Sequence, residues 1–341
     1  MPFLIELLHI TGIVTLCPKY KLDRNSLLLV ATKRNYIEVV RYLVKKGVDI
    51  NFQETIRDNL TPLMIASRFN SHQLVELLLN NGAIINQRTL TCGNTALHLA
   101  VKNDNRITVD ILLFRGANTN ITNNDGFTPL HKAVIYNAST YIIKKLLRYK
   151  ADVNIRDNEA ENTGLTPLDI AISCNNYEII SLLVSHVIRL DYSTCISNKT
   201  KGFKHNKKLV KDNKRLQRIA IHCLKDIEKM KQVRINSRFT LFELFVNNNV
   251  DLLLRCINKD DRFIVNFDKK LTVFNILYKD FIDTFISRHV LLNKASKILE
   301  DLFLDNESNT PSWNNLPNEI KDHIFTYINN DELKIMTGSK T

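Results

Sequence analysis

Two pairs of side chains have the residue types of a catalytic dyad. His131 with Asp169 could serve in acid–base chemistry, and Cys174 with His186 could form a thiol nucleophile and its base. All four lie at positions that recur along the chain, which favours a structural role. The sequence contains no phosphate-binding glycine loop, no dinucleotide-binding turn and no spacing typical of metal ligands. We therefore predict no enzyme activity, no catalytic residues, no metal and no cofactor.

The recurring positions belong to a motif that begins with threonine. Its copies start at Thr61, Thr95, Thr128 and Thr166, with a degenerate copy at Ser26, and successive starts are 35, 34, 33 and 38 residues apart. Threonine followed by proline is a typical helix start, because the hydroxyl caps the helix and the ring suits its first position. An alanine five residues after each threonine lets a partner helix approach closely. Each copy therefore predicts a helix packed against a second one.

The second helix of each unit is predicted from an apolar segment that ends at a glycine. Gly47, Gly82 and Gly116 suit the left-handed cap of a helix, and Lys150 and His186 take the place of glycine in the last two copies. One such unit cannot bury its apolar face alone, so the units must stack. The pattern resembles the ankyrin-repeat family, whose period is about 33 residues. The resemblance implies an all-α solenoid over residues 1–192, with repeats starting near residues 23, 58, 92, 125 and 163.

The first residues match the second half of a repeat. Ile5 to Leu8 precede Gly12 in the register of the second helices, so we expect a half repeat at 1–22, as in a shortened version of a longer gene. This apolar stretch has no basic leader and is too short to span a bilayer. We expect neither a signal peptide nor a membrane partner.

The connections between repeats vary in length, which makes them candidates for target recognition. They span 14, 13, 12 and 16 residues, whereas the helical part of the unit is nearly constant. Exposed loops can acquire recognition without disturbing the core, although a tolerated insertion explains the longest loop equally well. The candidate target-binding residues are Asn158, Glu159, Glu161 and Asn162 in the longest connection, with Arg57 and Arg88 in two others.

A basic segment follows the repeats. The net charge is +12, and nine lysines and arginines lie between Lys199 and Arg218 with Asp212 as the only acidic residue. We predict a linker over 193–215, because the charges are spaced and only Phe203 could stack on a base. Nuclear localisation and nucleic-acid contact are the alternatives. Six cysteines without a paired spacing indicate reduced thiols in a cytosolic protein.

Apolar helical spacing returns after the linker. We predict a helical region over 216–306 and a separate C-terminal motif over 307–341. In this motif a proline-initiated helix carries an apolar stripe that must be buried. Its opening, Leu-Pro-x-Glu-Ile from Leu316 to Ile320, resembles the F-box. The last helix of an F-box is missing after Met336, so the motif is a truncated, F-box-like one.

Ankyrin repeats, a helical region and a terminal F-box-like motif together resemble the poxvirus ankyrin-repeat proteins with a C-terminal PRANC domain. The resemblance implies an adaptor that counters host antiviral defence in the host cytoplasm, with the basic segment 199–218 as a route to the nucleus. Its repeats would hold an unidentified host target, and its motif would bind the host Skp adaptor of a cullin-RING (SCF) ubiquitin ligase. The implied Skp-binding residues are Leu316, Pro317, Ile320, Ile324, Tyr327, Ile328 and Leu333.

Two other functions compete with this one. A stoichiometric decoy would sequester a host signalling protein through its repeats without recruiting a ligase. A nuclear factor would act through the basic segment. Capture of the Skp adaptor separates the adaptor from the decoy.

Overall fold

The computed structural model describes residues 24–53, 59–158, 164–192, 200–232, 234, 240, 242 and 243. The helices are α2 (Arg24–Lys33), α3 (Ile37–Lys45), α4 (Pro62–Arg68), α5 (His72–Asn80), α6 (Ala96–Lys102), α7 (Arg106–Phe114), α8 (Pro129–Ile135), α9 (Thr140–Arg148), α10 (Pro167–Ser173), α11 (Tyr177–Tyr192), α12 (Lys201–Asp212) and α13 (Lys214–Gln232). Over these residues the predicted all-α class is confirmed, with one isolated bridge between Arg234 and Thr240. None of these helices is both long and apolar enough to cross a membrane.

Several expected regions lie outside the described residues. They are the half repeat 1–22, the part of the helical region beyond residue 243, and the whole F-box-like motif with Leu316, Pro317, Ile320, Ile324, Tyr327, Ile328 and Leu333. Four candidate target-binding residues also lie outside: Arg57, Glu159, Glu161 and Asn162.

The predicted threonine caps start the first helix of four repeats. Thr61, Thr95, Thr128 and Thr166 have extended backbone, and the side chain of each accepts a hydrogen bond from the backbone N–H three residues later. In α4, α8 and α10 a proline occupies the first helical position. A cap of this kind is typically worth about 1 kcal/mol relative to alanine. The local sequence therefore fixes where each repeat enters its first helix.

The left-handed positions that end the second helices are confirmed in four repeats. Gly47, Gly82 and Gly116 have φ of +73°, +90° and +85°, and Lys150 adopts φ +63° in the same place. The prediction for His186 is wrong, because α11 continues through it to Tyr192. The apolar helical pattern goes on through Val187, which is buried, and no glycine interrupts it.

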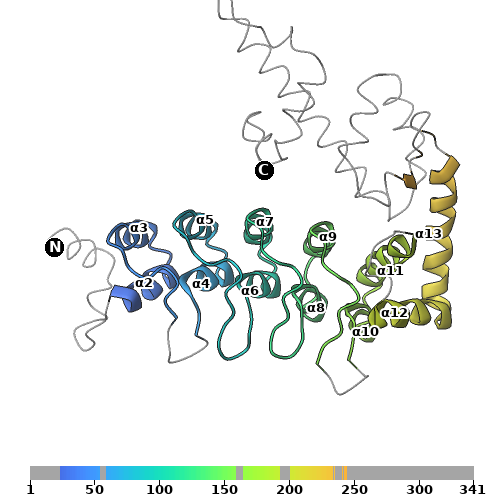
Figure 1. Cartoon of the computed structure of the whole chain (residues 1–341), viewed down its shortest axis with the longest axis horizontal. Coiled ribbons are helices and arrows are strands. Elements are labelled where there is room, and N and C mark those ends of the chain that lie inside the picture. The colour runs from blue at the N-terminus through green and yellow to red at the C-terminus, as the bar shows by residue number, and fades with distance from the viewer. Residues whose placement is uncertain are drawn as a thin grey trace, which may run out of the picture. The chain divides into compact units, whose positions relative to one another are not determined.

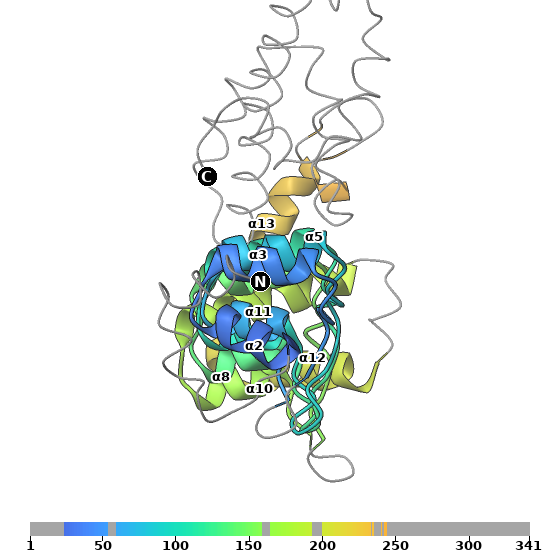
Figure 2. The same ribbon diagram turned by 90° about the vertical axis from the view of Figure 1, so that its left-hand side faces the viewer.

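The helices stack in two rows. α2, α4, α6, α8 and α10 form one row, and α3, α5, α7 and α9 form the other (Figure 1). Each first helix contacts the first helices next to it, and the second helices do the same. The alanines expected at the close contacts, Ala66, Ala100, Ala133 and Ala171, are fully buried. The connections between repeats form hairpins that project from one side of the stack (Figure 2).

The segment expected to be a linker contains a packed helix. Within 193–215, residues Lys201–Asp212 form α12, in which Gly202, Phe203 and Asn206 are buried. These three residues share one face of the helix, whereas the lysines that dominate the composition lie mostly on the exposed faces. The sparse buried face explains why the composition indicated a linker.

The described residues belong to two compact units. The first comprises the repeats up to Val187 and residues 200–209, which include most of α12, and the second comprises residues from Ile188 to Tyr192 and from Val210 onward. In the second unit the rings of Tyr192 and Phe242 meet edge to face with centroids 5.6 Å apart. The ammonium of Lys231 lies 5.2 Å and 5.3 Å from these two ring centroids. This cluster connects Tyr192 at the end of α11 with Lys231 of α13 and with Phe242, both of which belong to the predicted helical region.

Candidate protein-interaction surface

An asparagine ladder positions the hairpins. Asn51, Asn86, Asn120 and Asn154 each follow the left-handed position by four residues. The carboxamide oxygen of the first three accepts a hydrogen bond from a backbone N–H of the next hairpin: Asn51 from Ile84 at 2.8 Å, Asn86 from Asn118 at 2.9 Å, and Asn120 from Asp152 at 2.8 Å. A buried or half-buried backbone group needs such a partner. The ladder therefore fixes the spacing of successive hairpins.

The two described candidates for target binding both contact one residue of the hairpin between them. The guanidinium of Arg88 donates to the side-chain oxygen of Asn124 at 2.9 Å, and the side-chain amide of Asn158 donates to the backbone oxygen of Asn124 at 3.0 Å. The amide of Asn124 donates in turn to the carbonyl of Thr91 at 2.9 Å. Arg88 and Asn158 thus link neighbouring hairpins through Asn124. Both residues are also exposed to solvent. Their role in target binding stays a prediction.

A basic groove, which we define by Arg68, Leu99, Lys102, Lys132 and Tyr136, crosses the first helices α4, α6 and α8. Its volume is about 190 Å³. The ammonium of Lys102 lies 4.9 Å from the centroid of the Tyr136 ring, and that of Lys132 lies 6.0 Å from the same centroid. Cations are attracted to the faces of aromatic rings at this range. Two ammonium groups of the groove thus lie near the exposed ring of Tyr136.

Buried histidines connect each repeat to the next beneath this surface. In His98, Nδ1 accepts a hydrogen bond from the N–H of Thr95 at 3.1 Å, and Nε2 lies 3.0 Å from the carbonyl oxygen of Phe127 in the following repeat. His131 repeats the arrangement with Thr128 and the carbonyl of Leu165. Both rings bridge two repeats, and the expected structural role of these positions fits this geometry.

Burial lowers the pKa of both histidines to about 4. Desolvation of the charged ring is the main cause in each case, opposed by the hydrogen bond to the carbonyl of the next repeat. At His98 the positive charges of Lys132 and Arg88 lower the pKa further, whereas Asp157 raises that of His131. The surroundings of His98 are therefore more positive than those of His131.

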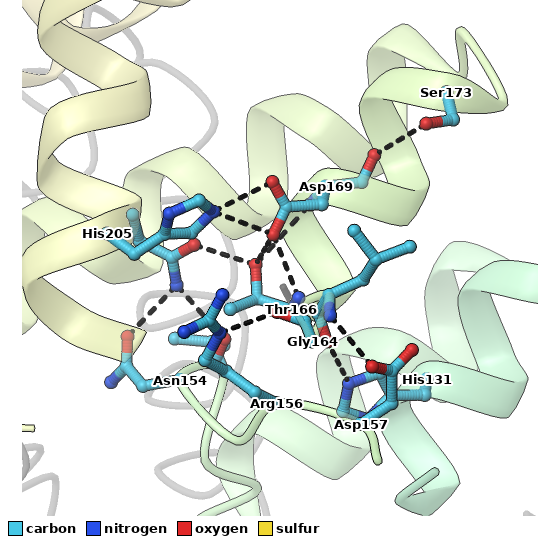
Figure 3. A network of polar contacts seen from close by, with 12 residues as sticks. His131, Asn154, Arg156, Asp157, Gly164, Thr166, Asp169, Ser173 and His205 are labelled. Atoms are coloured by element: carbon cyan, nitrogen blue, oxygen red, sulfur yellow. Dashed lines mark hydrogen bonds and ion pairs between the residues drawn. The ribbon is translucent and has the colours of Figure 1, made fainter. Parts of the chain in front are cut away.

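The last repeat contacts α12 in place of another repeat. Asp169 stands where the two preceding repeats have histidine, and one of its oxygens accepts hydrogen bonds from the N–H of Thr166 at 2.8 Å and from its hydroxyl at 2.7 Å. Nε2 of His205 lies 2.9 Å from the other oxygen of Asp169 (Figure 3). A histidine and carboxylate pair thus replaces the histidine and carbonyl contact found between the earlier repeats.

Asn206 extends the asparagine ladder into α12. Its side-chain amide donates to the side-chain oxygen of Asn154 at 3.0 Å and to the carbonyl of Val153 at 3.1 Å, and its oxygen accepts from the hydroxyl of Thr166 at 2.8 Å. One turn earlier, a Cβ on Gly202 would lie only 1.8 Å from the carbonyl oxygen of Asn154. The backbone of α12 therefore touches the last hairpin directly, and only glycine fits there.

One pair of dyad candidates, His131 and Asp169, is engaged in structural contacts. His131 bonds to Thr128 and Leu165, and Asp169 bonds to Thr166 and His205. Within the described residues no three His, Cys, Asp or Glu side chains gather as metal ligands would. The arrangement of the surface is that of a binding scaffold: rigid helices, cross-linked hairpins and a charged groove.

The sequence interpretation missed three residues of this surface. Asn124 bonds to hairpins on both sides, Tyr136 is the aromatic centre of the groove, and Asn206 closes the ladder. The spacing of Asn51, Asn86, Asn120 and Asn154 after the left-handed positions was a visible signal for the ladder. No local signal marks Asn206, because its partners are 40 to 53 residues away.

Comparisons with known proteins match the two parts of the chain to two families. The family model for ankyrin repeats (3 copies) matches residues 27–123 and 97–194, and that for the PRANC domain matches residues 236–338. The chain is 94% identical over 341 residues to the ankyrin repeat protein FPV031 of fowlpox virus (strain NVSL), with 100% of both chains covered. It is 28% identical over 324 residues to FPV219 of the same virus, covering 93% of this chain and 69% of that one. It is 26% identical over 341 residues to FPV232, covering 86% and 67%. Both matched families are protein-interaction modules.

Proposed function

The chain belongs to the poxvirus ankyrin-repeat proteins that carry a C-terminal PRANC domain, and from this membership we propose that it is a substrate-recruiting adaptor of a host ubiquitin ligase. On this proposal the ankyrin repeats hold a host protein, and the F-box-like motif binds the Skp adaptor of a cullin-RING ligase. The consequence for the host is loss of a protein that serves antiviral defence. The site of action is the host cytoplasm.

The observation that carries the proposal is the presence of two interaction modules in one chain. Ankyrin repeats match up to residue 194, and the PRANC match over 236–338 includes the Leu-Pro-x-Glu-Ile opening at Leu316–Ile320. A chain that binds two partners at once raises the local concentration of one near the other. A ligase adaptor needs this property and no chemistry of its own.

The motif supplies the proposed contacts with the Skp adaptor. Leu316, Ile320 and Ile324 recur at helical spacing and would form one apolar stripe on the expected helix, to which Tyr327 and Ile328 would add. An isolated amphipathic helix of this length is marginal in water, so its apolar face gains stability by burial in a partner. The remaining proposed contacts are Pro317 and Leu333.

Co-precipitation of the full chain from host cells tests the proposal. We expect the tagged chain to capture Skp adaptor and cullin, and Leu316→Asp combined with Ile320→Asp to abolish this capture, because two carboxylates cannot be buried in an apolar interface. Asn318→Asp combined with Asn329→Asp is the matched control, since these positions lie on the opposite side of the expected helix.

Three outcomes decide between the functions. If the chain with Leu316→Asp and Ile320→Asp loses the ligase subunits and the control variant keeps them, the adaptor function is supported. Capture of a host protein by a chain that brings down no Skp adaptor overturns the adaptor and supports the decoy. Equal loss in the control variant also counts against the proposed contacts.

A further inference from the structure

The basic groove on the first helices contains two lysines that form no ion pair with the described residues. Lys102 and Lys132 come from neighbouring repeats and take part in cation–π contacts, and the ion pairs of the described residues involve neither of them. Arg68 lines the groove one repeat earlier, and no acidic side chain lines it in the described part of the chain. The groove thus presents two ammonium groups that no described carboxylate neutralises.

Two ammonium groups share one ring at the centre of the groove. Lys102 and Lys132 both approach Tyr136, and Lys132 also lies 4.8 Å from the centroid of the Phe127 ring. The rings offset part of the repulsion between the two like charges. A carboxylate between the ammonium groups would be attracted to both, and this attraction is strongest where the groove walls exclude water.

The electrostatic surroundings of His98 report the same positive field. Its buried ring forms part of the groove lining, and the charges of Lys132 and Arg88 both act to lower its pKa. Both groups reach the ring from outside its own helix. One of these charges, that of Lys132, belongs to the basic groove itself.

Exposed apolar residues adjoin residues of the groove lining along the chain. Leu90, which stands between two residues of the groove lining, is 70% exposed, and Phe69, next to Arg68, is 51% exposed. Leu99 forms part of the lining and is nearly buried. A partner that only supplied charge would leave these apolar surfaces in water.

We infer that the basic groove binds an extended acidic segment of the target protein, with carboxylates at Lys102 and Lys132 and an apolar side chain against Leu90 or Phe69. This inference rests on the target-binding half of the proposed function. The positive charge of the groove favours an acidic segment. The exposed side chains of Leu90 and Phe69 favour apolar residues within that segment. Nucleic acid fits less well, because sites for it typically neutralise about six to ten phosphates, whereas the groove offers three cations.

Fluorescence anisotropy with the full chain tests the inference. The probe is a labelled dodecapeptide of glutamate and aspartate with leucine at every third position. The comparison probes are the same peptide with glutamine and asparagine in place of the acids, and a twelve-nucleotide oligothymidylate. We expect the acidic peptide to bind at least about tenfold more tightly than either comparison probe, and its affinity to fall with added salt.

Charge reversal locates the binding site. Lys102→Glu combined with Lys132→Glu should lower the affinity for the acidic peptide at least about tenfold. Lys102→Gln combined with Lys132→Gln should lower this affinity less. The control is Lys45→Glu combined with Lys46→Glu at the C-terminal end of α3, which makes the same change in net charge and also removes a cation–π contact, that of Lys46 with Tyr42. We expect this control to change the affinity by less than about twofold. Circular dichroism confirms that each variant is folded.

Failure of the inference is distinguishable from failure of the proposed function. No binding of the acidic peptide, equal binding by the charge-reversed groove, or tighter binding of oligothymidylate overturns the inference. The charge-reversed chain should still capture Skp adaptor, and the Leu316→Asp and Ile320→Asp chain should still bind the peptide. Loss of adaptor capture alone would overturn the ligase role and leave the groove intact.

Discussion

The side-chain amide of Asn206 donates a hydrogen bond to the side-chain oxygen of Asn154 at 3.0 Å. In the earlier repeats the equivalent oxygen accepts from the backbone of the next hairpin, as Asn120 does from Asp152. Asn206 of α12 therefore provides the hydrogen-bond donor for Asn154 that the hairpin of a further repeat would otherwise provide. Solenoids need a terminal element of this kind, because each repeat is stabilised by its neighbours.

Replacing Asn206 by leucine should detach α12 from the last repeat. The substitution removes hydrogen bonds to Asn154, Val153 and Thr166 in a buried site, and unsatisfied groups of this kind cost about 1–3 kcal/mol. Hydrogen exchange should accelerate at the amides of α12 and at the start of α10.

Lys208→Leu is the control for this variant, because Lys208 is exposed on the same helix. Exchange should stay unchanged in the control. Equal protection in the Asn206→Leu chain and the native chain would show that α12 does not cap the repeats.

Lys150→Gly should stabilise the chain. Lys150 has φ +63°, in the left-handed region where side chains with a Cβ are strained and glycine is not. We expect the free energy of unfolding to rise by about 1 kcal/mol in urea denaturation. Gly116→Ala, at φ +85° in the preceding repeat, is the matched opposite change and should lower it by about the same amount. A destabilised Lys150→Gly chain would contradict this assignment of strain.

The helix boundaries of the repeats could be predicted because their causes are local. Thr61 caps α4 through a residue three positions away, and Gly82 ends α5 through its own backbone conformation. Lys150 was placed correctly in the glycine position from its spacing alone, whereas His186 was not. The difference is that the apolar pattern of α11 continues past His186, so burial of the next turn overrides the repeat register.

The candidate site could be predicted only in outline, because its geometry depends on contacts between repeats. Arg88 and Asn158 were chosen as hairpin residues, and the structure adds that both bond to Asn124, which spacing could not reveal. The basic groove needs Lys102 of one repeat beside Tyr136 of the next, a pairing that follows from stacking. The role of α12 was hidden by its lysines, which outnumber the buried Gly202, Phe203 and Asn206.

Asn120→Ala should loosen two neighbouring hairpins. The side chain of Asn120 accepts from the N–H of Asp152 at 2.8 Å and donates to the carbonyl of Lys150 at 3.1 Å. Loss of both bonds should lower the free energy of unfolding by about 1–2 kcal/mol. Asn120→Asp keeps the acceptor and removes only the donor, so its loss in the same urea titration should be smaller. If Asn120→Asp lowers the free energy of unfolding more than Asn120→Ala does, the charge at this position and not the ladder of hydrogen bonds determines the stability of the hairpin.

The stability of the repeats should depend on pH through His98 and His131. Nδ1 of each ring accepts a backbone N–H, so a proton at Nδ1 would remove this acceptor and place a charge in a buried site. Burial of the ring lowers its native pKa from 6.5 to about 4, while the unfolded chain keeps the ordinary value. Below pH 6.5 the unfolded state binds more protons than the native state, so acid favours unfolding.

We accordingly expect the stabilisation from the neutral rings to be complete above about pH 6.5 and to be lost as the pH falls toward about 4. Between pH 6.5 and pH 5 each histidine should account for roughly 1.5 kcal/mol of the decrease in the free energy of unfolding, measured by urea titration at each pH. His98→Gln keeps an acceptor for the N–H of Thr95 and cannot take up a proton, so it should flatten this part of the pH profile. A native profile as flat as that of His98→Gln would show that the buried rings do not set the acid limit of the fold.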